Sequence, residues 1–380
     1  MNIVRVIPGR IRNARRDLIS TPLRVLLLLS TAFFGMSCKT QSAESPNLSR
    51  YEFERPEMGV PFRFVLYAPD QKSAEAAAES AFERVKQLNS IMSDYDPDSE
   101  LSKLSAGSGQ GQAVAVSPDL WLVLSRAEEL AKRSDGAFDI TVGPFVNLWR
   151  RARRAHQLPD PQRLAQARQA VGYQHVRLDA KHHLVELLVP NMRLDLGGIA
   201  KGYAVDQALK TLREHGISHA LVEGGGDVAV SEPPPGKKGW RLELSPLDAT
   251  NAPTARYLSL KNAAISTSGD LYQRLEIDGK RYSHIVDPHT GIGLTDHSLV
   301  SVIAPDSITA DSLTKVVSVL GPEKGLKFIE ATPQVAARIM REPGEKIEAY
   351  ESSRFKRYYE RSAAQSPHSE TGTGGVINCR

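Results

Sequence analysis

The chain has 380 residues, of which 41% are hydrophobic and 24% charged, a composition typical of a globular protein with enough apolar material for a large core. The formal net charge is +4, but residues 1–38 carry six arginines and one aspartate, so the rest of the chain carries −1. This distribution argues against a protein that binds nucleic acid through bulk charge. The two cysteines, Cys38 and Cys379, stand near opposite ends of the chain, which excludes a CxxC redox motif and a cysteine metal site.

The N-terminal segment is predicted to be a targeting signal. Arginines precede an apolar run at residues 23–34 that is too short to span a bilayer comfortably. Gly35-Met36-Ser37-Cys38 follows and resembles the cleavage site of a bacterial lipoprotein, although a glycine stands where an aliphatic residue is usual. We expect residues 1–37 to be a signal peptide and residues 38–50 a polar linker acylated at its cysteine, which places the exported protein at the periplasmic face of the inner membrane. The alternative is a short uncleaved anchor, which also leaves the body outside the cytoplasm.

The first part of the body is predicted to contain a strand and two helices. Residues 62–67 alternate as in a strand and follow Met58 and a glycine. Residues 73–92 place their apolar side chains on one stripe, as an amphipathic helix does. Residues 117–133 begin with Ser-Pro, a helix-start signal. The loop between these helices carries Tyr95, whose flat amphipathic ring suits stacking on a planar ligand.

A turn that suits an anion is predicted between Arg193 and Gln207. The segment reads as extended up to Asp195, passes through Gly197-Gly198 and continues as an amphipathic helix. Backbone N–H groups at such a turn approach an anion closely, and the helix dipole favours negative charge there. Lys201 adds a cation in the first helical turn, and Asp195 adds an acceptor carboxylate. The alternative is an ordinary strand–turn–helix junction with glycines for steric relief.

Three other segments combine small residues with polar side chains near predicted turns. They are residues 136–144 (Gly-Ala-Phe-Asp-Ile-Thr-Val-Gly-Pro), 223–227 (Glu-Gly-Gly-Gly-Asp) and 263–270 (Ala-Ala-Ile-Ser-Thr-Ser-Gly-Asp). Residues 149–154 form the densest basic cluster, which suits a phosphate or an acidic partner but is more typical of a solvated helix face.

Residues 282–291, Tyr-Ser-His-Ile-Val-Asp-Pro-His-Thr-Gly, place a histidine and an aspartate in one short segment. Ser268, His284 and Asp287 are the residue types of a hydrolase triad, but the sequence has no nucleophile elbow to present the serine. We therefore keep the triad only as a minor alternative.

The last helix is predicted over residues 306–320, with N-cap candidates at its start and Gly321-Pro322 after its end. Asp311 lies inside it, Thr314 three residues later and Lys315 four residues later, so all three share a helical face. A final strand is expected near residues 335–340. The charged and then Ser/Gly/Thr-rich residues 351–380 are predicted to be a disordered polar tail.

Five of these blocks, in this order, resemble the FAD:protein FMN transferase (ApbE) family. They are residues 92–104, 136–144, 193–207, 265–270 with 284–291, and 310–321. The resemblance covers roughly residues 51–345. It implies an α+β fold over residues 51–350, with mixed or antiparallel sheets flanked by helices and a flavin cleft between sub-domains.

The resemblance also implies roles for single residues. FAD contacts are expected from Met58, Tyr95, Ala137, Phe138, Asp139, Asp195, Lys201 and Ile285. His284 is the histidine that the family pattern specifies, and it is the candidate base for an acceptor hydroxyl. Asp311 and Lys201 are the other catalytic candidates.

The implied metal site departs from the family pattern. The family holds Mg²⁺ against the FAD diphosphate with a backbone carbonyl at the position of Gly198, with Asp311 and with a small oxygen ligand four residues later. In this chain Lys315 occupies that last position, and Thr314 precedes it. Three interpretations stay open: the threonine still reaches the metal, the lysine replaces the metal as a point charge, or the lysine forms only an exposed helical pair with the aspartate.

The implied reaction splits the diphosphate of FAD, attaches FMN to a Thr or Ser hydroxyl of a target protein and releases AMP. Flavin-carrying subunits of membrane redox complexes are the implied acceptors. Two alternatives remain: an FAD diphosphatase that hands FMN to water, and a flavin-binding protein without turnover.

Overall fold

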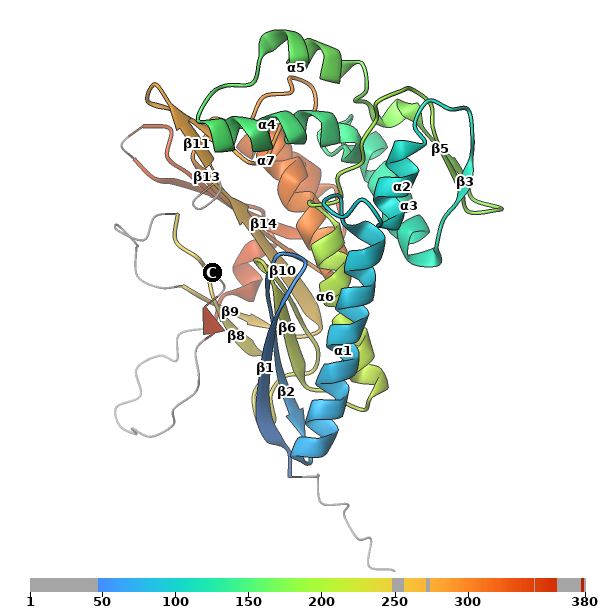
Figure 1. Ribbon diagram of the computed structural model, residues 1–380. Coiled ribbons are helices and arrows are strands. Elements are labelled where there is room, and N and C mark those ends of the chain that lie inside the picture. The colour runs from blue at the N-terminus through green and yellow to red at the C-terminus, as the bar shows by residue number, and fades with distance from the viewer. Residues whose placement is uncertain (1–46, 248–255, 271–273, 345, 361–376, 379–380) are drawn as a thin grey trace, which may run out of the picture. The chain divides into compact units, whose positions relative to one another are not determined.

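The computed structural model describes residues 47–247, 256–270, 274–344, 346–360 and 377–378 (Figure 1). The predicted signal peptide, Cys38 and most of the predicted linker lie outside these residues. None of the helices in the described part of the chain combines the length and the apolar composition that a membrane crossing requires.

The centre of the fold is an eight-stranded antiparallel sheet. Its strands, in spatial order, are β1 (Ser49–Glu57), β2 (Val60–Ala68), β6 (Ala220–Gly224), β7 (Asp227–Val230), β10 (Ala263–Gly269), β13 (Ser298–Ala304), β14 (Ala336–Arg341) and β15 (Glu348–Glu351). Side chains alternate across a strand. In β2, Phe62, Phe64 and Leu66 enter the main core on one face, whereas Val65 enters a second core on the other.

Three long helices pack against one face of this sheet. They are α1 (Gln71–Met92), α6 (Ala200–Glu214) and α7 (Ser307–Glu330) (Figure 1). The predicted apolar stripe of α1 is buried in the main core between this helix layer and the sheet. The backbone of α7 leaves helical geometry at Gly321, where φ is 73°, so the predicted helix end is present, although a second helical segment follows it directly.

A three-stranded sheet covers part of the opposite face. It consists of β16 (Ile377–Asn378), β8 (Trp240–Glu243) and β9 (Tyr257–Leu260), and the apolar residues of β8 and β9 share a core with the short helix η3 (Phe355–Tyr358). The prediction that residues 351–380 form a disordered tail is therefore wrong for residues 351–360. Glu351 belongs to β15 and Phe355 is fully buried, because the second core offers its ring a long-range partner that the polar local composition concealed.

The remaining elements belong neither to the eight-stranded sheet nor to its layer of three long helices. The helices are α2 (Glu100–Ala106), α3 (Pro118–Arg133), η1 (Ile140–Val142), α4 (Gly143–Ala155), α5 (Pro161–Arg168) and η2 (Tyr173–His175). The strands are β3 (Val114–Ala115), β4 (Val176–Asp179) and β5 (Leu184–Leu187) in one small sheet, and β11 (Arg274–Ile277) with β12 (Lys280–Ser283) in a hairpin. The predicted α+β class, with antiparallel sheets flanked by helices, is confirmed.

Helices α6 and α7 approach closely at Gly202. A Cβ atom there would lie 2.4 Å from the carbonyl oxygen of Ser307 and 2.8 Å from Cβ of Asp311. We expect Gly202→Ala to lower the free energy of unfolding by roughly 1–3 kcal/mol, because overpacking forces the two helices apart. Urea unfolding measures this change. Gly107→Ala is the matched control, since its Cβ would meet only the carbonyl oxygen of Leu104, at 3.6 Å. Equal losses in the two variants would contradict the prediction.

Candidate active site

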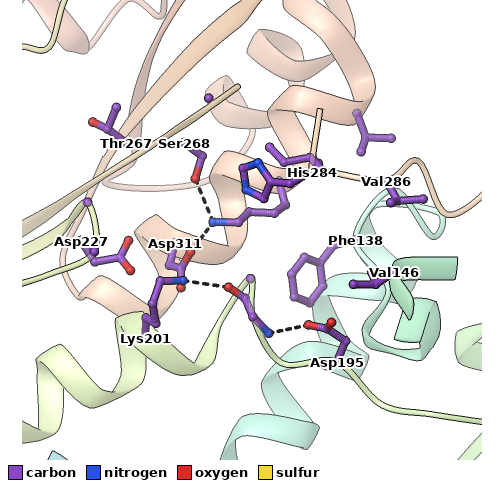
Figure 2. A pocket seen from close by; sticks show the side chains of 18 of the residues that line it. Phe138, Val146, Asp195, Lys201, Asp227, Thr267, Ser268, His284, Val286 and Asp311 are labelled. Atoms are coloured by element: carbon purple, nitrogen blue, oxygen red, sulfur yellow. Dashed lines mark hydrogen bonds and ion pairs between the residues drawn. The ribbon is translucent and has the colours of Figure 1, made fainter. Parts of the chain in front are cut away.

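A cavity of about 780 Å³ opens between the helix-covered sheet and the segments around α4. This volume lies in the range typical of small-molecule sites. One wall is formed by the start of α6, α7, the β6–β7 turn and the end of β10; the other is formed by η1, α4 and residues 284–288 (Figure 2). The predicted anion turn and the predicted last helix therefore meet at one cavity.

The turn before α6 forms the floor of this cavity. Lys201 Nζ donates a hydrogen bond to the carbonyl oxygen of Gly197 at 2.9 Å, and the N–H of Gly197 donates to Asp195 Oδ1 at 2.8 Å (Figure 2). A Cβ at Gly198 would come within 3.2 Å of Lys315 Cγ and 3.4 Å of Phe138 Cε2. Glycine at this position allows the turn to lie directly against α7 and the Phe138 ring.

Asp311 and Lys315 form a buried ion pair on the cavity wall. Asp311 is fully buried, its Oδ1 pairs with the ammonium of Lys315, and its Oδ2 accepts a hydrogen bond from the N–H of Gly202 at 3.2 Å. Burial alone would raise the pKa of Asp311, but the charges of Lys315 and Lys201 outweigh it and lower the pKa, so this carboxyl stays ionised. The interpretation of an exposed helical pair is wrong, because the aspartate has no solvent exposure.

Asp227 is a third carboxylate at the same cavity. It follows the Gly225-Gly226 turn between β6 and β7, whose residues have φ of 62° and 94°, conformations that favour glycine. Ser266 Oγ donates to Asp227 Oδ1 at 2.5 Å, whereas Oδ2 is buried without a hydrogen-bond partner among the described residues. Figure 2 shows this carboxylate pointing toward Lys201 and Asp311. Asp227 is not among the predicted site residues, although the glycine run before it is a usable signal.

Burial, together with the charge of Asp311, raises the pKa of Asp227 to about 7. A raised carboxyl pKa contributes stability at low pH that is lost as the pH rises through the folded-state value. We therefore expect Asp227→Asn to gain stability relative to wild type by on the order of 1–3 kcal/mol between pH 5 and pH 8. Urea unfolding at both pH values measures it. A difference between the two proteins that does not change with pH would contradict the assignment.

Arg150 of α4 joins the opposite wall to the floor. Its guanidinium pairs with Asp94 and, at 2.9 Å, with Asp195, and it lies 4.2 Å from the ring centre of Tyr95. Arg153 also lines the cavity. The prediction of a solvated helix face is wrong for these two arginines. One face of α4 lines the cavity, with Val146, Arg150 and Arg153 at positions i, i+4 and i+7. The spacing groups these side chains on one face, but only the docking of the helix decides that this face points into the cavity.

Comparisons with known proteins identify the family. The ApbE family model matches residues 58–339. The chain belongs to the ApbE family. It is 33% identical over 271 residues to the FAD:protein FMN transferase of Haemophilus influenzae, covering 69% of this chain and 78% of that protein. It is 31% identical over 348 residues to that of Escherichia coli, covering 88% and 97%.

Solved ApbE structures agree with this membership. The flavin transferase ApbE from Vibrio cholerae matches with a TM-score of 0.73 and 27% identity, over 82% of this chain and 99% of that chain. The apo form of the Pseudomonas stutzeri flavinyl transferase ApbE matches with a TM-score of 0.73 and 28% identity, over 82% and 97%.

Most residues expected to contact FAD from the ApbE resemblance line the cavity. These are Ala137, Phe138, Asp139, Asp195, Lys201 and Ile285, and His284 lies beside them. Asp139 also organises its own loop, because its carboxylate accepts from the N–H groups of Thr141, at 2.7 Å, and Tyr173, at 2.8 Å. Burial raises the pKa of Asp139. The roles of these residues toward FAD remain predictions.

Three predicted site residues do not line the cavity. Met58 lies in the β1–β2 turn with a φ of 49° and packs on the main core. Tyr95 is 77% exposed, with its ring against Arg150. Thr314 is fully buried, and its hydroxyl is within hydrogen-bond distance of the carbonyl oxygen of Asp311, at 2.6 Å, and of Ser268 Oγ, at 2.9 Å.

The serine of the alternative hydrolase triad is engaged elsewhere. Lys315 Nζ donates to Ser268 Oγ at 2.9 Å, and the hydroxyl of Thr314 approaches the same oxygen. The carboxylate of Asp287 accepts from Thr290 Oγ1 at 3.0 Å and from the N–H of His289 at 2.9 Å. Because Ser268 and Asp287 use their side chains in these contacts, the structure does not support a hydrolase triad.

The residues at the implied metal site do not fit Mg²⁺. An octahedral Mg²⁺ needs open oxygen ligands. Both oxygens of Asp311 have partners, the hydroxyl of Thr314 is engaged with the carbonyl oxygen of Asp311 and with Ser268, and an ammonium stands at the remaining position. No group of three or more His, Cys, Asp or Glu side chains suited to a metal occurs among the described residues.

Proposed function

We infer that the protein is an FAD:protein FMN transferase, which splits FAD, attaches FMN to a protein hydroxyl and releases AMP. The observation that carries this conclusion is membership of the ApbE family over most of the chain, with curated relatives of that name at 31–33% identity. The cavity supports it, because an apolar section around Phe138 and Ile285 adjoins a section where Lys201 and Lys315 supply positive charge.

The proposed reaction is a phosphoryl transfer. A Thr or Ser hydroxyl oxygen of the acceptor forms a bond to the FMN phosphorus, the bond from that phosphorus to the bridging oxygen breaks, and AMP leaves with the bridging oxygen. Such reactions are accelerated mainly by positioning and by neutralising charge on the phosphate oxygens. We assign that neutralisation to Lys201 and Lys315. Since the residues do not fit Mg²⁺, we assign no step to a metal.

His284 is proposed to take the proton of the acceptor hydroxyl. It lies in the segment after β12 and lines the same cavity as the two lysines. Histidine suits this role because its ordinary pKa allows it to accept a proton near neutral pH. Asp311 is proposed to fix the position of the Lys315 ammonium through their ion pair.

We propose that the enzyme acts outside the cytoplasm, anchored to the inner membrane through acylated Cys38. The support is the arginine-rich start, the short apolar run and the Gly-Met-Ser-Cys sequence. A flavin-carrying subunit of a membrane redox complex is the proposed acceptor, since it would share that location.

The function is tested by incubating the purified protein with FAD and such an acceptor subunit. Flavin fluorescence on the denatured acceptor, with AMP in equal amount, supports the transferase. Free FMN with AMP and an unlabelled acceptor would indicate the diphosphatase. Intact FAD that stays bound would indicate a carrier without turnover.

A further inference from the structure

Three elements converge on the side chain of Lys315, whose ammonium has two partners among the described residues. It pairs with Asp311 one helical turn earlier on α7 and donates a hydrogen bond to Ser268 Oγ, at the end of β10, at 2.9 Å (Figure 2). Its aliphatic stem lies against Gly198 in the turn before α6. The Lys315 side chain is 17% exposed, so the ammonium is held in the cavity wall rather than extended into solvent.

We propose that the Lys315 ammonium replaces the divalent cation implied for the ApbE family, so that this protein cleaves FAD without a metal ion. The inference rests on the proposed function, because it concerns the same diphosphate. The proposal follows from the lack of open oxygen ligands for a metal ion at this position. Asp311 already binds an ammonium and a backbone N–H, and a divalent ion in the same place would face a like charge at short range.

Lysine has the chemistry for this substitution. Its ammonium is a compact point charge with three N–H donors. Within the described part of the chain, Asp311 and Ser268 engage two of these donors, which leaves the third for a non-bridging phosphate oxygen. Lys201 supplies a second positive charge at the same cavity. Two ammonium groups match the two negative charges of the FAD diphosphate.

The test compares AMP release from FAD in EDTA and in MgCl₂, with the acceptor subunit present in both buffers. Wild-type protein should release AMP at rates that agree within about twofold in the two buffers. In Lys315→Thr, a hydroxyl stands four residues after Asp311. We expect this variant to lose at least tenfold of the rate in EDTA and to recover most of it in MgCl₂. Lys324→Thr is the matched control, because Lys324 is an exposed lysine of the same helix, and it should behave as wild type.

Two binding measurements need no turnover. The affinity for FAD, measured by quenching of flavin fluorescence, should not depend on MgCl₂ in wild type and should depend on it in Lys315→Thr. Electron paramagnetic resonance of added Mn²⁺ should show binding in the presence of FAD only for the variant. Wild-type protein that binds Mn²⁺ with FAD, or that requires MgCl₂, would overturn the proposal without any variant. Wild type that releases no AMP in either buffer would remove the transferase function, while the binding measurements would still decide the role of Lys315.

Discussion

Replacing His284 with alanine is expected to lower the rate of FMN transfer by about 10²- to 10⁴-fold, the usual contribution of a general base. The affinity for FAD should change much less, because the proposed role concerns the proton of the acceptor hydroxyl. Stopped assays that follow AMP release and acceptor fluorescence measure the rate, and quenching of flavin fluorescence measures the affinity.

His289→Ala is the control for this prediction. His289 lies five residues later, its side chain is 54% exposed, and its ring contacts Asp287 and the backbone of Asp135 rather than lining the cavity. Its replacement should leave the rate within about tenfold of wild type, well short of a lost general base. If both variants lose activity equally, or if His284→Ala transfers FMN at the wild-type rate, the assignment of the base is wrong.

Replacing Lys201 with alanine is expected to lower the rate by about 10²- to 10³-fold and to weaken FAD binding, because charge stabilisation at a reacting group commonly contributes this much. Burial alone would lower the pKa of Lys201, but the carboxylates around it, first that of Asp311, raise the pKa and keep the ammonium charged. Without this ammonium, the incoming diphosphate would lose one of the two lysine charges that the cavity offers it.

Riboflavin provides the control for Lys201→Ala. It carries the same ring as FAD but no phosphate, so its affinity should be equal in the variant and in wild type. A parallel loss of riboflavin and FAD affinity would mean that the substitution disturbs the whole cavity, and the role assigned to the charge would then fail.

Local sequence signals were sufficient where one segment builds its own part of the site. Gly197, Gly198 and Lys201 lie in one turn and the helix that follows it, so their arrangement was predictable from residue type and spacing. The proximity of Asp311 and Lys315 followed from helical periodicity in the same way.

The burial of that pair did not follow from periodicity. It depends on Gly202, whose lack of a side chain lets α6 pack directly on the helix that carries Asp311. The position of Arg150 also depends on tertiary packing. Its basic neighbours predict a solvated helix face, whereas the docking of α4 places its guanidinium against Asp195. Phe355 is buried in a core that includes residues of β2, β8 and β9, which lie far from it along the chain, so no local pattern reports its burial.

Strand β1 was missed for a related reason. Its charged residues are typical of an edge strand, where they discourage pairing with other chains, and its first two residues, Ser49 and Arg50, fall within the predicted linker. Its pairing with β2 supplies the partner that the sequence alone does not reveal.

The most direct test of the account is a crystal structure of the wild-type protein with FAD, grown in EDTA. We predict that the diphosphate lies in the cavity beside the Gly197-Gly198 turn, with a phosphate oxygen within hydrogen-bond distance of Lys315 Nζ and another near Lys201. FAD bound with its diphosphate outside this cavity, or a complex that forms only when a metal ion displaces Lys315 from Asp311, would contradict it.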